Sequence, residues 1–316
     1  MSSATAIDYK PAADALGAAG KILLVSHEYT DGDDLGAMLA LKFALEALGK
    51  KPVVCSRGGA PDNLMFLPGV QDVLDQLPPE NFDIVALLGC SDAGRTGFGS
   101  SPAGKIINID HHPDNKRFGE INLVDPEAAA TCEVIYHLIK ALAAEITKPM
   151  AINLLTGIFN DTGGFRHANT SAAVLEIAAE LMRRGARIDR ISEYYFGKSE
   201  LPKLRAWAKA LENARFDPEQ KMVYSVVTEE ELAEVGAGPE DLEGVVSILN
   251  TVPEANYSML LKQRGDEIKG SLRSENYKGV DVSAIARNLG GGGHKLAAGF
   301  KLKGKIEKTK DGWKIT

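Results

Sequence analysis

Short apolar runs, separated by longer segments with helical spacing, dominate the first half of the chain. We expect buried strands at residues 22–25, 52–55, 84–88, 105–109 and 121–124. After the first run, apolar residues recur at helical spacing from Leu35 to Leu48, and Gly49 favours the end of that helix. Buried strands that alternate with helices form parallel sheets with both faces covered. The pattern therefore predicts an α/β fold built on a mainly parallel sheet.

The pattern changes twice in the second half of the chain. Helical spacing dominates from Pro126 to about Arg215, whereas strand-like runs return from Lys221 onwards. The expected strands are 222–227, 257–262 and 267–272, and an expected helix at 280–289 precedes the glycines at 290–293. We therefore expect a first α/β domain over 1–186, a helical linker over 187–215 and a smaller mixed α/β domain over 216–316.

The charge balance narrows the class of partner. The chain has 36 Lys and Arg against 43 Asp and Glu, which gives a net charge of −7. Proteins that bind long nucleic acids usually carry a basic stripe, because contacts to phosphates dominate their affinity. No such stripe is evident in the sequence. This argues against long nucleic acids and leaves short nucleotides open as ligands.

The cysteines and apolar runs indicate a cytoplasmic protein without membrane attachment. Cys55, Cys90 and Cys132 are odd in number and widely spaced, as is typical of reduced thiols rather than a disulfide framework. The N-terminus lacks a basic segment followed by an apolar one. The longest apolar runs have the length of strands and are too short to span a bilayer.

Polar residues that can bind metal follow two of the expected strands and end one expected helix. They are His27, Asp31, Asp33, Asp110, His111, His112 and Asp161. Ligands of open α/β sheets bind at the carboxyl ends of the strands, and imidazole and carboxylate groups are common metal ligands. Each segment also has a purely structural interpretation. The segment 27–34 could be a turn with an acidic helix N-cap, the pair His111-His112 could arise by chance, and the segment after Asp161 could be a helix C-cap and loop.

Taken together, these segments resemble the DHH phosphoesterases, a family named for the triplet Asp110-His111-His112. The spacing of His27, Asp31 and Asp33 is similar to the first motif of the family, and the run 161–165 is similar to its fourth. The glycine-rich run 290–300 and the segment 271–274 are similar to two segments of the DHH-associated domain. The motifs occur in order across nearly the whole chain. The resemblance implies a DHH domain followed by a DHH-associated domain.

The resemblance also implies two manganese ions in the first domain, held by His27, Asp31, Asp33, His111 and Asp161. His27 and Asp31 would hold one ion, and the other three residues would hold the second. Mixed carboxylate and imidazole ligands suit manganese better than magnesium. Two ions roughly 3.5–4 Å apart activate a water for attack on phosphorus. Asp33 and His112 would then be the catalytic residues, with His112 orienting the site or contacting the phosphate.

Substrate contacts are implied mainly in the DHH-associated domain. The expected residues are Arg95, Arg273, Ser274, Gly291, Gly292, Gly293 and His294. Consecutive glycines leave backbone N–H groups open to a phosphate, and Arg and His side chains add charge-assisted donors.

The arrangement looks like the branch that hydrolyses nanoRNA and phosphoadenosine phosphate. Expected substrates are short RNA or DNA oligonucleotides, linear dinucleotides such as pApA, or 3′-phosphoadenosine 5′-phosphate, and the family suggests a homodimer. Two alternatives stay open. One is a nucleotide-binding protein with a degenerate metal site, and the other is a hydrolase of polyphosphate or another phosphate ester.

One position departs from the pattern of the family. Gly89 follows the strand 84–88, where the family places an aspartate that bridges both metals. Asp34 or Asp92 could substitute for it, the site could hold its metals weakly or hold only one, or the protein could bind nucleotides without hydrolysing them. Because the other ligands are present, we favour an active enzyme. If Gly89 weakens the metal pair, Gly89→Asp should raise manganese affinity and turnover.

Overall fold

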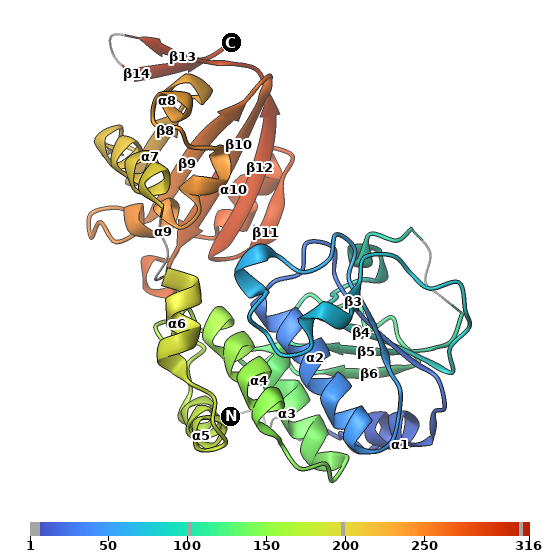
Figure 1. Cartoon of the computed structure of the whole chain (residues 1–316). Coiled ribbons are helices and arrows are strands. Elements are labelled where there is room, and N and C mark those ends of the chain that lie inside the picture. Colours follow the sequence, from blue (N-terminus) through green and yellow to red (C-terminus); the bar gives the residue numbers. More distant parts are fainter. Residues whose placement is uncertain (1–6, 100–102, 197–199, 310–311) are drawn as a thin grey trace. The chain divides into compact units, whose positions relative to one another are not determined.

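The computed structural model describes residues 7–99, 103–196, 200–309 and 312–316, and the chain divides into two compact units, 1–198 and 199–316. Figure 1 shows the whole chain, and each unit is described by itself. Within the described residues, no helix combines the length and the apolar character needed to cross a membrane. All three cysteines are buried and form no disulfide, as the sequence predicts.

The first unit is built on a parallel sheet of six strands, which confirms the predicted fold class. The strands are β1 (Ile22–Ser26), β2 (Val53–Cys55), β3 (Val73–Leu74), β4 (Ile84–Leu88), β5 (Lys105–Asp110) and β6 (Ile121–Val124). Their order is β3-β2-β1-β4-β5-β6, and every pair is parallel. The chain leaves β1 towards β2 and β3, then crosses to β4 on the other side of β1. This reversal is where open α/β sheets bind ligands.

The helices of this unit lie on one side of the sheet. They are α1 (Lys10–Ala18), α2 (Gly32–Ala47), α3 (Thr131–Ala141), α4 (Lys148–Asp161), α5 (Ala172–Arg183) and α6 (Ile188–Phe196), of which α5 and α6 pack against α4. Their apolar side chains form one cluster with Ile22 and Leu24 of β1. Leu23 and Val25 of the same strand point to the opposite face and join a smaller cluster with residues such as Phe82. The prediction that alternating helices cover the sheet was therefore incomplete, because connecting segments pack the second face.

Two glycines let the central helix α2 pack closely against its neighbours. A Cβ on Gly36 of α2 would lie 2.5 Å from the backbone oxygen of Asn153 in α4. A Cβ on Gly157 of α4 would lie 2.3 Å from the sulfur of Cys132 and 2.7 Å from Oδ1 of Asp33. Side chains at these positions would separate the helices. The glycines thus bring the first turn of α2, the start of α3 and the end of α4 to one place.

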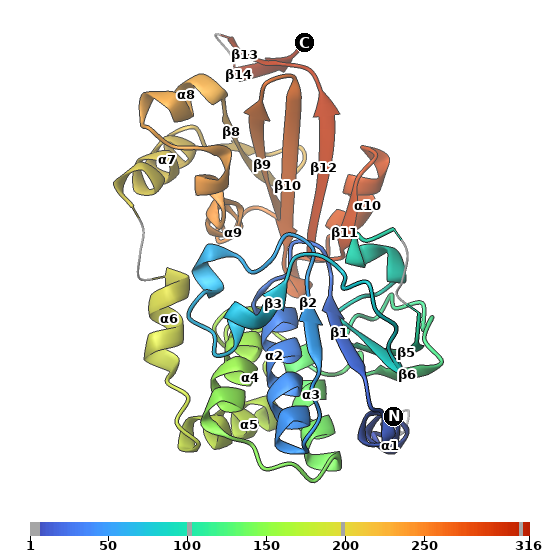
Figure 2. The same ribbon diagram turned by 45° about the vertical axis from the view of Figure 1, so that its right-hand side comes forward.

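The second unit is a smaller mixed α/β unit, as the sequence predicts. Its sheet has the order β11-β12-β10-β9-β8-β7, and Figure 2 shows β9, β10 and β12 side by side. The strands are β7 (Arg215–Asp217), β8 (Met222–Val227), β9 (Tyr257–Arg264), β10 (Glu267–Ser274), β11 (Gly292–His294) and β12 (Ala297–Lys303). The helices are α7 (Leu201–Glu212), α8 (Glu229–Glu234), α9 (Val245–Leu249) and α10 (Val282–Asn288). A separate pair of antiparallel strands is formed by β13 (Ile306–Thr309) and β14 (Gly312–Ile315).

The segment 187–215, expected as a linker, contributes one helix to each unit. Ile191 of α6 joins the core of the first unit, whereas Ala206 and Ala210 of α7 join a core of the second. Residues 197–199 of this segment lie outside the described residues. Because α6 packs with the first unit, its side chains lie near the residues discussed next.

Candidate metal centre

The turn between β1 and α2 presents two of the expected ligands. Nδ1 of His27 lies 2.7 Å from the backbone oxygen of Glu28, and its Nε2 lies 2.6 Å from Oδ2 of Asp34. Asp31 is the N-cap of α2, because its Oδ1 accepts hydrogen bonds from the N–H groups of Asp33 and Asp34 at 2.9 and 3.2 Å. The interpretation as an acidic N-cap is thus correct for Asp31. A carboxylate that caps a helix through one oxygen still has a second oxygen for a cation.

Asp33 lies on the first turn of α2 and faces the start of α3. Its Oδ2 accepts from the N–H of Thr131 at 2.6 Å, and its Oδ1 accepts from the N–H of Cys132 at 2.9 Å. The free N–H groups at a helix start favour a carboxylate charge. Asp33 is 2 % exposed, so α3 holds this carboxylate in place inside the protein.

His111 and Asp161 reach Asp33 from the ends of β5 and α4. Nδ1 of His111 lies 3.2 Å from the backbone oxygen of Ala128, and its Nε2 lies 3.1 Å from Oδ2 of Asp161. The same Nε2 lies 4.0 Å from Oδ2 of Asp33. His27 and His111 therefore share one arrangement, in which a backbone carbonyl orients Nδ1 and Nε2 faces carboxylates. Histidines that bind metal are typically oriented in this way.

The side chains form two groups that could each hold a metal ion. Within each group, one ligand atom from every residue lies within 4.8 Å of the others. The groups are His27 with Asp31 and Asp34, and Asp33 with His111 and Asp161. The structure thus brings together all five side chains that the resemblance implied as ligands, in the same two sets. It adds Asp34 to the first set.

The electrostatics of the site suit a divalent cation. Burial raises the pKa of Asp33 well above its usual value, and the charges of Asp161 and Asp34 raise it further. Burial opposes the charged form of His111, but the hydrogen bond to Asp161 and the charge of Asp33 raise its pKa to about 10. Buried carboxylates that repel each other gain from a cation between them. This donor set therefore fits a metal ion.

His112 is oriented by the aspartate of its own triplet. Its Nδ1 lies 2.6 Å from Oδ1 of Asp110, and the side chain of Asn115 donates to Oδ2 of the same aspartate. Burial disfavours the charge of Asp110, but these hydrogen bonds, with that from His112 first, lower its pKa below the usual value. Asp110 is fully buried and supports His112 rather than joining either group of ligands.

The segment after β4 places Arg95 near the same end of the sheet. Arg95 lies in the short helix 93–96, and its Nη1 donates to the backbone oxygen of Gly89 at 3.4 Å. Its backbone oxygen accepts from the N–H of Glu28 at 2.8 Å, beside His27. Arg95 is exposed, so its position is compatible with the predicted contact to substrate.

In the second unit, the strand register places Arg273 and His294 in one row. Both residues pair with Ala297, Arg273 from β10 and His294 from β11. Residues paired directly across antiparallel strands point to the same face of a sheet. In the next row on that face, Gly292 and Gly299 pair with each other and Gly299 pairs with Ser271, so Ser271 carries the only side chain of these three residues. The register thus creates a face with two basic side chains and a hydroxyl beside two glycines.

Three of the other expected contacts in this unit, Ser274, Gly291 and Gly293, also have structural roles. The hydroxyl of Ser274 is buried and donates to the backbone oxygen of Asn256 at 2.8 Å. The glycine run was expected as open backbone, and Gly292–His294 form the edge strand β11, which pairs with β12 on one side only. A Cβ on Gly291 would lie 2.1 Å from the backbone oxygen of Gly299, and a Cβ on Gly293 would lie 2.7 Å from that of Ala297. Only at Gly292, among the three expected contacts, would a Cβ meet no described atom within 4 Å.

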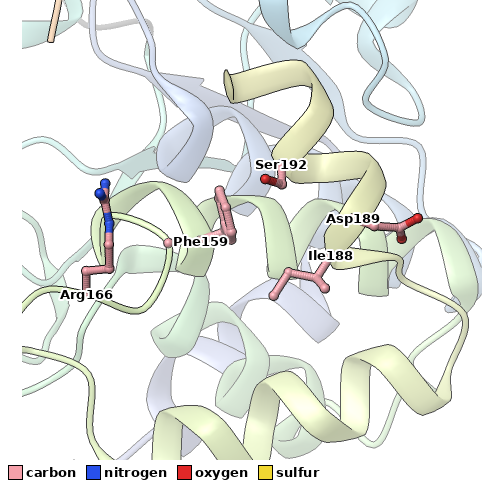
Figure 3. A pocket seen from close by; sticks show the side chains of 6 residues that line it. Phe159, Arg166, Ile188, Asp189 and Ser192 are labelled. Carbon is pink, nitrogen blue, oxygen red and sulfur yellow. The ribbon is translucent and has the colours of Figure 1, made fainter. Parts of the chain in front are cut away.

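The sequence did not indicate that α6 lies beside the candidate metal centre. A Cβ on Gly32 would lie 1.8 Å from the hydroxyl oxygen of Tyr195, so this hydroxyl packs against the turn between Asp31 and Asp33. Ile188, Asp189 and Ser192 of α6 line a hollow of about 490 Å³ together with Phe159, Gly164 and Arg166. Figure 3 shows Ser192 on the side of α6 that faces Phe159. No spacing links α6 to the metal motifs, because tertiary packing alone brings it there.

Comparisons with known proteins agree with this geometry. Residues 21–158 match the N-terminal domain of the DHH family, and residues 219–311 match the DHHA1 domain. The chain is 36% identical over 288 residues to the bifunctional oligoribonuclease and PAP phosphatase NrnA of Thermus thermophilus, with 90% of this chain and 85% of that protein covered. The Bacillus subtilis protein of the same name is 25% identical, with 89% of each covered. An exopolyphosphatase-related protein from Bacteroides fragilis has a crystal structure with a TM-score of 0.88 and 27% identity, with 94% of this chain and 91% of that chain covered.

Proposed function

This chain belongs to the DHH family of metal-dependent phosphoesterases, in its nanoRNase-like branch, and from that premise we propose that it uses manganese to hydrolyse short oligonucleotides, linear dinucleotides or 3′-phosphoadenosine 5′-phosphate. The relatives from Thermus thermophilus and Bacillus subtilis, named as oligoribonucleases and PAP phosphatases, support these substrates. We further propose that the protein acts in the cytoplasm as a homodimer.

The observation that carries this proposal is the pair of neighbouring ligand groups, His27 with Asp31 and Asp34, and Asp33 with His111 and Asp161. Two adjacent metal ions are a common arrangement in enzymes that attack phosphate esters. The mixture of imidazole and carboxylate ligands favours manganese over magnesium or calcium, which prefer oxygen ligands.

The chain's own residues would position the substrate and hold the reacting groups. When bound, the metal pair supplies a water of lowered pKa and positive charge beside the phosphate. The N–H groups at the start of α3 hold the carboxylate of Asp33, and the backbone carbonyl of Ala128 holds the imidazole of His111. Both proposed metal ligands are therefore fixed in position. Asp110 holds His112 through Nδ1, and His112 would donate a hydrogen bond to the phosphate. Arg273 and His294 would bind a phosphate of the substrate on the second unit.

A panel of substrates tests this function. We expect manganese-dependent release of mononucleotides from pApA or a short RNA, or of inorganic phosphate from 3′-phosphoadenosine 5′-phosphate, and no product after treatment with EDTA. Saturable nucleotide binding without product would instead identify a nucleotide-binding protein. Release of phosphate from polyphosphate alone would identify the third alternative, to which the name of the Bacteroides fragilis protein is relevant.

Replacing Arg273 tests the proposed phosphate contact in the second unit. We expect Arg273→Ala to raise KM for 3′-phosphoadenosine 5′-phosphate about 10- to 100-fold with a smaller change in kcat, since a hydrogen bond to a charged group contributes roughly 1.5–3 kcal/mol. Steady-state kinetics measure both constants. Arg264→Ala is the matched control, because Arg264 is exposed at the far end of the β9–β10 pair. Equal effects of the two substitutions would contradict the assignment.

A further inference from the structure

We propose that Asp34 supplies the metal-binding carboxylate that position 89 lacks. The two positions are coupled, because the carboxylate of Asp34 fits at the site only while residue 89 has no side chain. The inference deepens the proposed function, since it rests on metal being bound at this site. It assigns a role to a residue that the motif at His27, Asp31 and Asp33 does not include.

The first observation is the space that Asp34 fills. Gly89 has a φ of +62°, and its N–H donates to the backbone oxygen of Ile109 at 3.0 Å, which fixes the direction of its missing side chain. A Cβ on Gly89 would lie 1.5 Å from Oδ1 of Asp34 and 2.1 Å from its Cγ. The carboxylate of Asp34 therefore occupies the position at which a side chain of residue 89 would begin.

The second observation is the state of the Asp34 carboxylate. Asp34 is 3 % exposed, and its Oδ2 lies 2.6 Å from Nε2 of His27. Its Oδ1 is also buried, and no described residue donates a hydrogen bond to it. A buried carboxylate oxygen without a partner is unfavourable, and a bound cation would remove that penalty. The free oxygen thus points to a ligand at the place where the carboxylate meets Gly89.

The position of Asp34 relates it to both ligand groups. It is one of the three residues of the His27 and Asp31 group. It also directly follows Asp33, a member of the second group, on the first turn of α2. Asp34 thus lies next to both groups, as a carboxylate between two cations must.

Asp92, the other substitute that the sequence allowed, is engaged elsewhere. Its Oδ1 accepts from the N–H of Gly94 at 2.7 Å, as the N-cap of the short helix 93–96. Its Oδ2 forms an ion pair with Nζ of Lys116 at 2.7 Å. Both oxygens thus have partners, and Asp92 belongs to neither ligand group among the described residues.

These contacts reverse the effect expected from the sequence for Gly89→Asp. The new side chain would collide with the Asp34 carboxylate and add another negative charge to a crowded acidic site. We therefore expect Gly89→Asp to weaken manganese binding. Asp34→Ala should also weaken it, by at least about tenfold, because losing even a group that merely supports a ligand costs that much. The double variant Asp34→Ala/Gly89→Asp should regain affinity, since aspartate tolerates a left-handed backbone better than most residues.

The experiment compares the wild-type chain with both single variants, Asp34→Ala/Gly89→Asp and the control Asp34→Ala/Gly89→Ala. The control fills the same space without a carboxylate. Calorimetric titration with Mn²⁺ measures affinity, and circular dichroism verifies folding. The proposal requires the double aspartate variant to bind manganese at least about tenfold more tightly than Asp34→Ala and the control. Asp92→Ala should bind as the wild type does.

Three outcomes would overturn the proposal. Asp34→Ala could bind manganese as tightly as the wild type, Gly89→Asp alone could gain affinity, or the double aspartate variant could bind no better than its alanine control. If the wild type still hydrolyses the substrates with manganese in any of these cases, the proposed function stands without this role for Asp34. If the wild type neither binds manganese nor hydrolyses any substrate, both proposals fail.

Discussion

Asp33→Asn should lower kcat/KM for nucleotide hydrolysis by about a thousandfold or more, equivalent to roughly 4 kcal/mol of transition-state stabilisation. Asp33 is the proposed ligand whose carboxylate is held most rigidly, because the N–H groups of Thr131 and Cys132 each donate to one of its oxygens. An amide has no negative charge, and its nitrogen cannot accept a hydrogen bond from either N–H group. Initial rates with saturating manganese measure the effect.

Stability measurements distinguish this loss of chemistry from a loss of fold. Without metal, the unpaired N–H group should cost about 1–3 kcal/mol in the free energy of unfolding. The loss of repulsion with Asp161 and Asp34 offsets part of that cost. Asp114→Asn, an exposed position beside the triplet, is the matched control and should retain wild-type activity. Turnover of Asp33→Asn within tenfold of the wild type would contradict the proposed role.

Removing metal should lower the unfolding temperature of the first unit. A ligand at about 100 times its Kd stabilises the folded state by roughly 2.7 kcal/mol, which corresponds to about 5–10 °C for a unit of this size. Bound metal should stabilise the first unit because a cation offsets the repulsion among buried carboxylates such as Asp33 and Asp161. Differential scanning calorimetry with Mn²⁺ and with EDTA measures the difference.

The two tryptophans make this experiment specific to one unit. Trp207 and Trp313 both belong to residues 199–316, so their fluorescence reports the unfolding of the second unit. We expect manganese to shift the calorimetric transition of the first unit and to leave the fluorescence transition unchanged. Asp161→Asn should abolish the shift. Equal shifts of both transitions would contradict a metal effect confined to the first unit.

The sequence by itself determined most strands of the first unit and the side chains at their ends that can bind metal. Apolar runs such as 84–88 predicted β4 because a buried strand must be apolar on both faces. The residues that follow β1 and β5 were expected at one edge of the sheet, because parallel strands end at the same edge. The structure brings His27, Asp31, Asp33, His111 and Asp161 together there, in the sets that the resemblance implied. Local pattern, strand direction and motif order were sufficient for these features.

Only the tertiary structure decided which residue fills the place of the side chain missing at Gly89. Asp34 and Asp92 are both aspartates near a strand end, and no periodicity distinguishes them. Packing does, because the first turn of α2 places Asp34 against Gly89, whereas Asp92 caps a short helix and pairs with Lys116. The position of α6 beside the site was invisible for the same reason. Contacts between distant segments depend on how helices pack on the sheet, and sequence spacing along one element carries no record of them.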